Sequence, residues 1–138
     1  TLEPWDDECR ERIRKHQNAR AQRGFMTLEC YRGLSRLAVP GGSNVLLDGL
    51  GNLVAGELYS PQGRGTAEIL AGTEHLLEQC CHLTMVADEV FSGGRDYEGD
   101  TLRYLREMGA LHCALARRAD RVIEVVCGIP NILKEAAP

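Results

Sequence analysis

The order of hydrophobic and polar residues first predicts a helix near the start of the chain. The stretch from Asp6 to about Arg20 contains no Gly or Pro, and Asp6 or Asp7 is suited to cap its start. Within it, Cys9, Ile13 and His16 are spaced four and three positions apart. This spacing places His16 on the apolar face of the predicted helix, next to the body of the protein.

The same reading predicts two further helices and three short strands. The helices run from about Thr66 to Cys81 and, after the loop Ser92 to Gly99, as far as about Ala119. The strands are Val45 to Leu47, Leu83 to Val86 and Arg121 to Cys127, with Gly128 and Pro130 closing the last one. Helices that alternate with almost wholly apolar strands predict the α/β class, a mostly parallel sheet with helices on both faces.

Acidic residues follow two of the predicted strands. The first strand stops at Asp48, and the second runs into Asp88 and Glu89. Ligands of parallel sheets bind beyond the carboxyl ends of the strands, so these carboxylates are suited to hold a magnesium ion or a nucleotide. They are equally suited to cap the segments that follow, and the sequence leaves both interpretations open.

Composition indicates one soluble globular domain over residues 1–138. Hydrophobic residues make up 43% and charged residues 26%, which excludes collagen-like, coiled-coil and disordered chains. A net charge of -4 argues against a general nucleic-acid binder. No apolar run approaches the length of a membrane span, and the first residues lack the pattern of a signal peptide, so a cytoplasmic protein is expected.

Basic residues nevertheless crowd the first helix and its end. They suit small anions such as nucleotide phosphates, or else form a solvated helix face. They are Arg10, Arg12, Arg14, Lys15, Arg20 and Arg23. The six cysteines show no CxxC or similar ligand spacing, so a role in the core is expected for them.

A phosphate-binding loop is absent from the sequence. No GxxxxGK[ST] occurs, and neither Lys15 nor Lys134 follows a glycine. The chain opens with Thr1 at what reads as the end of a strand just before a helix. We therefore expect that an N-terminal strand and phosphate loop, on the order of thirty residues, precede this chain.

Motifs distributed over nearly the whole chain resemble one known family. In chain order they are Thr1-Leu2-Glu3, Asp6-Asp7-Glu8-Cys9, Arg12-Ile13-Arg14-Lys15-His16, Thr27-Leu28-Glu29, Leu46-Leu47-Asp48, Asp88-Glu89-Val90-Phe91, Ala116 to Asp120 and Val125 to Lys134. Their order and spacing are similar to those of the bifunctional adenosylcobinamide kinase/adenosylcobinamide-phosphate guanylyltransferases of cobalamin biosynthesis. The resemblance implies a fold like that of the P-loop nucleotide-binding proteins.

The resemblance also implies two reactions and the residues that carry them. A nucleoside triphosphate such as ATP phosphorylates adenosylcobinamide, and GMP is then transferred from GTP to the resulting phosphate through a guanylyl-histidine, here His16. A neutral imidazole is a competent nucleophile near pH 7. The implied nucleotide contacts are Thr1, Leu2, Glu3, Gln17, Asn18, Ala19, Arg20, Glu29 and Asp48. Asp48 is also the candidate magnesium ligand, and a homotrimer is expected.

Several residues depart from the family pattern and keep two alternatives open. Asp88 and His112 stand where the family usually has Asn, and Gly49, Gly51 and Gly56 replace residues with polar side chains. A degenerate member that binds nucleotide or corrinoid without catalysis is therefore the alternative hypothesis. A magnesium-dependent phosphotransferase of unrelated specificity would explain the acids but leaves His16 without a role.

Overall fold

The computed structural model describes residues 7–21 and 23–136, without the side chains of residues 9, 12, 16 and 19–21. The elements, in chain order, are α1 (Asp7–Ala21), the 3-10 helix η1 (Leu34–Arg36), β1 (Asn44–Asp48), α2 (Leu50–Tyr59), α3 (Thr66–Gln79), β2 (His82–Val86), α4 (Gly99–Arg118), β3 (Arg121–Val126) and β4 (Ile129–Glu135). The three predicted helices and three predicted strands are confirmed to within a few residues.

Helix α2 was not predicted from the sequence. It contains Gly51 and Gly56, and glycine is among the least favourable residues for a helix interior. The helix starts directly after β1, because Gly49 adopts a left-handed conformation (φ 80°) that turns the chain at the strand end. Leu50, Leu53 and Val54 are buried, so tertiary packing holds this helix in place.

The strands form two separate pairs, which is the main difference from the expected sheet. β1 and β2 are parallel, with Asp48 opposite Val86. β3 and β4 are antiparallel and are joined by a tight turn at Cys127 and Gly128, since so short a connection cannot return the chain for parallel pairing. The α/β class is confirmed, but in the described part of the chain parallel pairing is limited to β1 and β2.

The third predicted strand ends before Gly128 and Pro130, as expected, but the chain then continues into β4, which was not predicted. Pro130 lies within β4, opposite Val125 of β3. Proline has no backbone N–H to donate to a sheet, so it is confined to edge strands, and β4 is an edge strand of its pair.

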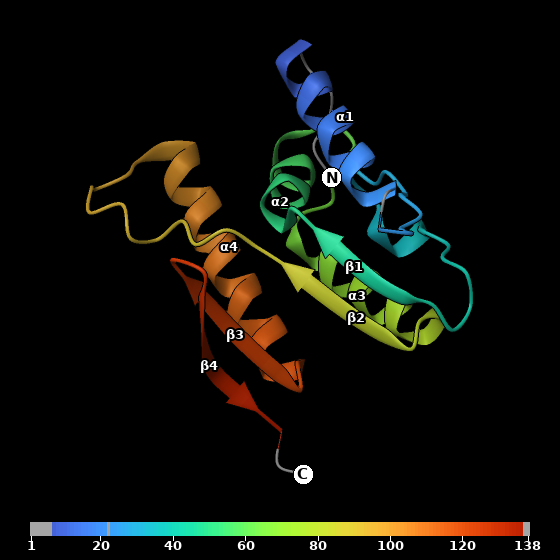
Figure 1. Cartoon of the computed structure of the whole chain (residues 1–138). Helices are drawn as coiled ribbons and strands as arrows, with labels where there is room; N and C mark the ends of the chain where they lie inside the picture. Colours follow the sequence, from blue (N-terminus) through green and yellow to red (C-terminus); the bar gives the residue numbers. More distant parts are fainter. Residues whose placement is uncertain (1–6, 22, 137–138) are drawn as a thin grey trace.

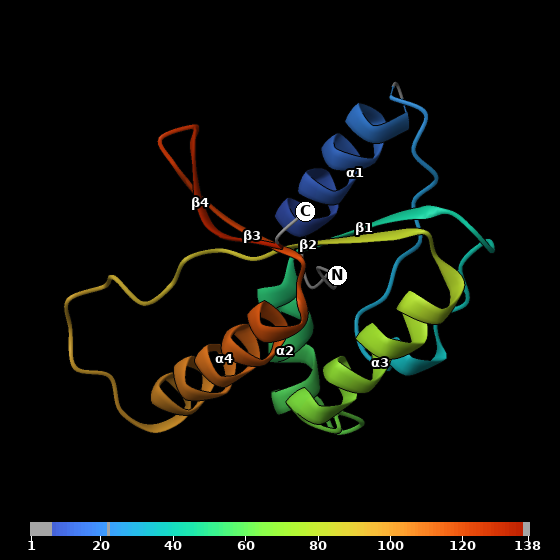
Figure 2. The ribbon, with the colours of Figure 1, turned by 90° about the horizontal axis from the view of Figure 1, so that it is seen from below.

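The core lies between the β1–β2 pair and the helices that cover one of its sides (Figure 1). Turned by 90°, the ribbon shows α1 on one side of this pair and α2, α3 and α4 on the other (Figure 2). The fully buried apolar side chains come from η1, β1 and these three helices. They are Leu34, Leu47, Leu50, Leu53, Val54, Ile69, Leu76, Met108 and Leu111.

The core role expected for the cysteines holds in part for Cys30, which packs against the core, and is wrong for the exposed ones. Cys30 and Cys80 are half-buried, while Cys81, Cys113 and Cys127 are exposed, and all five are unbridged thiols. Among the helices that the structure describes, none has the length and apolarity to cross a membrane.

Candidate functional site

The carboxyl ends of β1 and β2 lie side by side, as the sequence predicted. Because the strands pair in parallel with Asp48 opposite Val86, the acids that follow β2 emerge at the same edge as Asp48. Asp48 itself is half-buried and directly precedes the turn into α2. This edge therefore gathers carboxylates from two neighbouring strands.

The two acids after β2 have different surroundings. Glu89 accepts a hydrogen bond from the backbone N–H of Phe91 (2.7 Å), and this bond is the main reason that its pKa is lowered. For Glu89 this contact favours the capping interpretation. Burial is the main cause of the raised pKa of Tyr104, and the charge of Asp88 adds to it. The Tyr104 hydroxyl donates to the carbonyl oxygen of Gly51 (3.3 Å), which joins α4 to the first turn of α2.

Two of the residues that the family resemblance assigns to the nucleotide are in direct contact. The Gln17 side-chain amide donates a hydrogen bond to Glu29 (Nε2 to Oε1, 3.0 Å), although the two residues are twelve positions apart. The contact joins α1 to the loop that leads to η1. Both side chains are exposed, as is that of Asn18, so they are open to a ligand.

The other assigned residues are described only in part. His16 lies within α1, one residue before Gln17, and Ala19 and Arg20 follow in the same helix. The side chains of these three residues, and Thr1, Leu2 and Glu3 altogether, lie outside the described part of the chain. The structure therefore leaves their proposed roles as predictions. Ile13, three residues before His16, is half-buried as its place on the apolar face requires.

Some of the basic residues of α1 are engaged with neighbours on the helix. Arg10 donates to Asp7 (3.1 and 3.0 Å), and Arg14 donates to Glu11 (3.1 and 2.7 Å). All four side chains are substantially exposed. For Arg10 and Arg14 the structure favours the solvated helix face over an anion site.

The described residues contain no group of three or more His, Cys, Asp or Glu side chains that could hold a metal ion. Magnesium, however, is often held by one or two carboxylates together with substrate phosphates and several waters. A single half-buried carboxylate such as Asp48 fits that mode of binding. It does not fit a metal held by protein side chains alone.

One of the glycines that depart from the family pattern is required by packing, because a Cβ atom on Gly56 would collide with the backbone carbonyl oxygen of Tyr31. A Cβ atom on Gly51 would lie 2.8 Å from the Tyr104 hydroxyl oxygen, so the end of that side chain would have to shift. The third, Gly49, has a positive φ that disfavours any side chain. At Gly56 a neighbouring segment thus occupies the space of a side chain.

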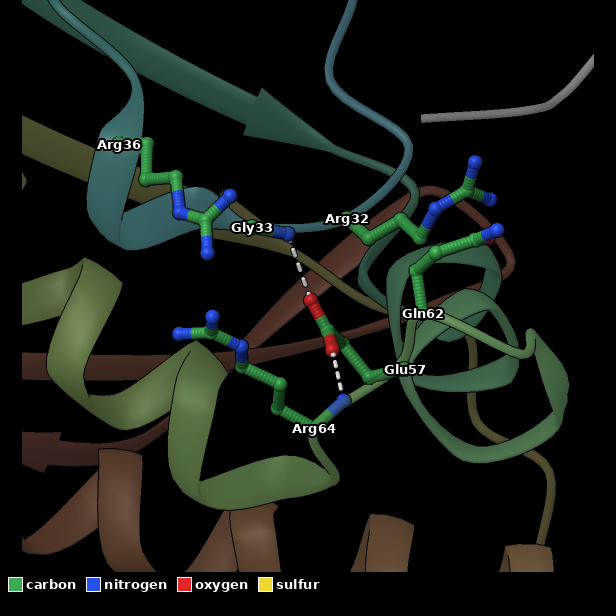
Figure 3. A pocket seen from close by; sticks show the side chains of 6 residues that line it. All are labelled: Arg32, Gly33, Arg36, Glu57, Gln62 and Arg64. Atoms are coloured by element: carbon green, nitrogen blue, oxygen red, sulfur yellow. Dashed lines mark hydrogen bonds between the residues drawn. The ribbon is translucent and has the colours of Figure 1, made fainter.

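A pocket of about 110 Å³ that sequence reasoning missed lies between η1, the end of α2 and the loop before α3 (Figure 3). Three of its lining residues are arginines, and the others are a glycine, a glutamate and a glutamine. They are Arg32, Gly33, Arg36, Glu57, Gln62 and Arg64. The available signal was two arginines that are each followed by a glycine, Arg32-Gly33 and Arg64-Gly65, because glycine allows the backbone to turn at both places.

Comparison with known proteins gives one match. A family model described as cobinamide kinase / cobinamide phosphate guanyltransferase matches residues 1–133. Searches of curated proteins and of solved structures found no match. The matched range takes in the α1 segment, the β1–β2 pair, the strand-end carboxylates and the β3–β4 pair except for the last two residues of β4.

Proposed function

The chain belongs to the cobinamide kinase / cobinamide phosphate guanyltransferase family, and from this premise we propose that it transfers GMP from GTP to adenosylcobinamide phosphate. Family membership indicates, in general terms, kinase and guanylyltransferase chemistry in cobalamin biosynthesis. The nucleotide site of the proposal consists of α1 from His16 to Arg20, the loop around Glu29, and Asp48 at the end of β1.

The proposed transfer proceeds in two steps through His16. An imidazole nitrogen attacks the α-phosphorus of GTP and forms an N–P bond, while the bond to the β-phosphate oxygen breaks and pyrophosphate leaves. A phosphate oxygen of the acceptor then attacks the same phosphorus. The N–P bond breaks, the product carries a diphosphate linkage, and the imidazole is regenerated. Arg20 is proposed to offset the charge that develops on the phosphates.

The contact between Gln17 and Glu29 is the observation that carries this proposal. It brings the residue that follows the proposed nucleophile against the loop to which the family resemblance assigns a nucleotide contact. A nucleotide held by the Glu29 loop would therefore lie beside the α1 segment that carries His16. Without this contact the two segments would be linked by sequence motifs alone.

Asp48 is the proposed magnesium ligand. Magnesium bound with the phosphates would neutralise part of their charge and align them. The carboxylate is half-buried at the strand edge. Asp48 is proposed rather than Glu89 because the family resemblance assigns a nucleotide contact to Asp48.

The kinase reaction is part of the proposal only for a polypeptide that also contains a phosphate loop. The 138 residues include no GxxxxGK[ST] motif, so they contain no phosphate-binding loop of that type for ATP or GTP. The corrinoid acceptor and a homotrimer are proposed from family membership. A non-catalytic member is the second candidate, because Gly49, Gly51 and Gly56 replace polar side chains of the family pattern, and at Gly56 the Tyr31 carbonyl oxygen occupies the space of a side chain.

A labelling experiment on the native protein tests the transfer. GTP labelled at the α-phosphate should yield an acid-labile, alkali-stable protein adduct that is lost in His16→Ala. His82→Ala, which replaces an exposed histidine on β2, is the matched control and should keep the adduct. Gln17→Ala should slow labelling roughly two- to tenfold, because one hydrogen bond at the site is lost.

Two outcomes would contradict the proposal. An adduct that persists in His16→Ala would exclude His16 as the nucleophile. Tight GTP binding by the native protein with no adduct under any condition would favour the non-catalytic candidate instead.

A further inference from the structure

A buried carboxylate fixes the walls of the arginine-lined pocket. Glu57 is 2% exposed, and its two oxygens accept hydrogen bonds from the backbone N–H groups of Gly33 (2.6 Å) and Arg64 (2.7 Å). The close-up shows this carboxylate between the two loop segments that it ties together (Figure 3). The backbone positions from which Arg32, Arg36 and Arg64 project are therefore held in place, and the charge of Glu57 is directed at backbone donors.

The guanidinium groups of Arg36 and Arg64 have donor capacity that the described residues do not use. Arg64 has an ion pair with Glu68 at 3.8 Å, near the outer limit for such a contact, and its side chain is 58% exposed. Glu68 in turn accepts hydrogen bonds from the backbone N–H and the hydroxyl of Ser35. Within the described residues the Arg36 guanidinium has no hydrogen bond or ion pair, although it is close enough to Glu68 to lower the pKa of that carboxyl.

The size of the pocket limits its ligand. At about 110 Å³ it has room for several water molecules, which is enough for a tetrahedral oxyanion. Pockets that enclose a molecule of nucleoside size or larger are typically a few hundred Å³ or more. Planar guanidinium forks match the oxygens of a phosphate in pairs, so a phosphate group suits the three arginines better than a carboxylate or a halide.

We propose that the pocket formed by Arg32, Arg36 and Arg64 is a phosphate-binding site, separate in its residues from the nucleotide site around His16. Its ligand is inorganic phosphate or the phosphate group of a small monoester. Both ligands carry a dianionic tetrahedral phosphate group, whose oxygens accept hydrogen bonds from Arg36 and Arg64. The remainder of a monoester would extend through the open side of the pocket. The site does not depend on the guanylyl transfer proposed above.

Calorimetric titration of the chain with sodium phosphate at constant ionic strength tests the proposal. Arg36→Gln should weaken binding about tenfold or more, because charge-assisted hydrogen bonds are lost. Arg36→Lys keeps the charge but not the planar fork and should give an intermediate affinity. Arg103→Gln is the matched control, since it removes the same charge from an exposed position on α4 outside the pocket and should leave the affinity unchanged.

The second arm distinguishes the two sources of phosphate. Glycerol phosphate that binds as tightly as inorganic phosphate, or more tightly, indicates an ester ligand, and a preference for inorganic phosphate indicates the free ion. Absence of phosphate binding to the wild-type chain would overturn the proposal, as would equal losses in Arg36→Gln and Arg103→Gln. Binding should persist in His16→Ala, so failure of the guanylyl transfer and failure of this site give different results.

Discussion

At the scale of single residues, His112 makes the stability of the fold depend on pH. It is half-buried on α4, its Nε2 atom is buried without a hydrogen-bond partner in the described structure, and the Phe91 ring meets it edge-on at 5.7 Å. Burial lowers the pKa of His112 below its ordinary value of 6.5. The folded state therefore favours the neutral imidazole, and the unfolded chain takes up the proton first as the pH falls.

The free energy of unfolding should accordingly be highest above about pH 6.5 and decrease as the pH falls from 6.5 toward the folded pKa. His112→Asn, which supplies the residue usual in the family, should remove this decrease. Urea unfolding at pH 7.5 and at pH 5.5 measures the difference in the free energy of unfolding between the two pH values. His82→Asn, at an exposed position of β2, is the control and should keep the dependence. An unchanged pH dependence in His112→Asn would show that the decrease comes from other groups.

Some residues of the site were predictable from sequence because short-range patterns position them. Asp48 follows an apolar run, and the end of a buried strand in a parallel pair leads to the ligand edge. The contact between Gln17 and Glu29 was not predictable, because it depends on the path of a loop without regular structure. The arginine pocket needs η1 to meet a loop some thirty positions later in the chain, and no local pattern encodes that meeting.

At the scale of elements, two glycines in helices should respond in opposite ways to the same substitution. A Cβ atom on Gly72 of α3 would collide with Leu34 of η1, which is fully buried. On Gly109 of α4 it would lie 3.5 Å from the Phe91 ring, an ordinary contact. Gly72→Ala should therefore destabilise the protein by about 1–3 kcal/mol through overpacking. Gly109→Ala should stabilise it by roughly 0.5–1 kcal/mol through helix propensity.

Chemical denaturation of both variants at one pH compares these effects directly. Each variant is the control for the other, because both add one methyl group to a helical glycine. If Gly72→Ala were as stable as the wild type, η1 could not be packed against α3 as closely as described. If the slope of the free energy of unfolding against denaturant concentration is the same as in the wild type, the fold itself is intact in both variants.

The elements that sequence reasoning missed share a physical cause. Helix α2 contains two glycines that lower its propensity, yet it forms because it buries Leu50, Leu53 and Val54 in the core. Strand β4 contains Pro130 and forms because the turn at Gly128 returns the chain along β3. In both cases tertiary contacts or turn geometry override a local preference, whereas α1, α3 and α4 follow their own periodicity.

At the scale of the whole molecule, the two strand pairs leave apolar surface uncovered. In the described part of the chain, β2 pairs only with β1 and β3 pairs only with β4. Ile129, Val125 and Leu133 of the β3–β4 pair are 70%, 65% and 61% exposed. Exposed strand edges with large apolar side chains favour pairing with other chains, because both their backbone groups and their side chains lack partners.

We therefore expect the chain to self-associate, with a mass in light scattering that increases with concentration. The double variant Val125→Lys and Ile129→Lys should stay at the mass of one chain, since lysine on an exposed edge opposes strand pairing. Leu77→Lys adds charge at an exposed leucine of α3 (48%) and should associate like the wild type. A wild-type chain that stays monomeric throughout would contradict the expectation.

The concentration dependence also separates two kinds of assembly. A homotrimer of the kind proposed from family membership is closed, so its mass levels off at three chains. Pairing between the free edge of one molecule and a different edge of the next need not close, and its mass would continue to increase. A plateau at three chains that the double lysine variant abolishes would place the β3–β4 surface within the trimer contact. A plateau that survives in that variant would place the contact on another face, and the apolar strand pair would then be an edge that the trimer leaves exposed.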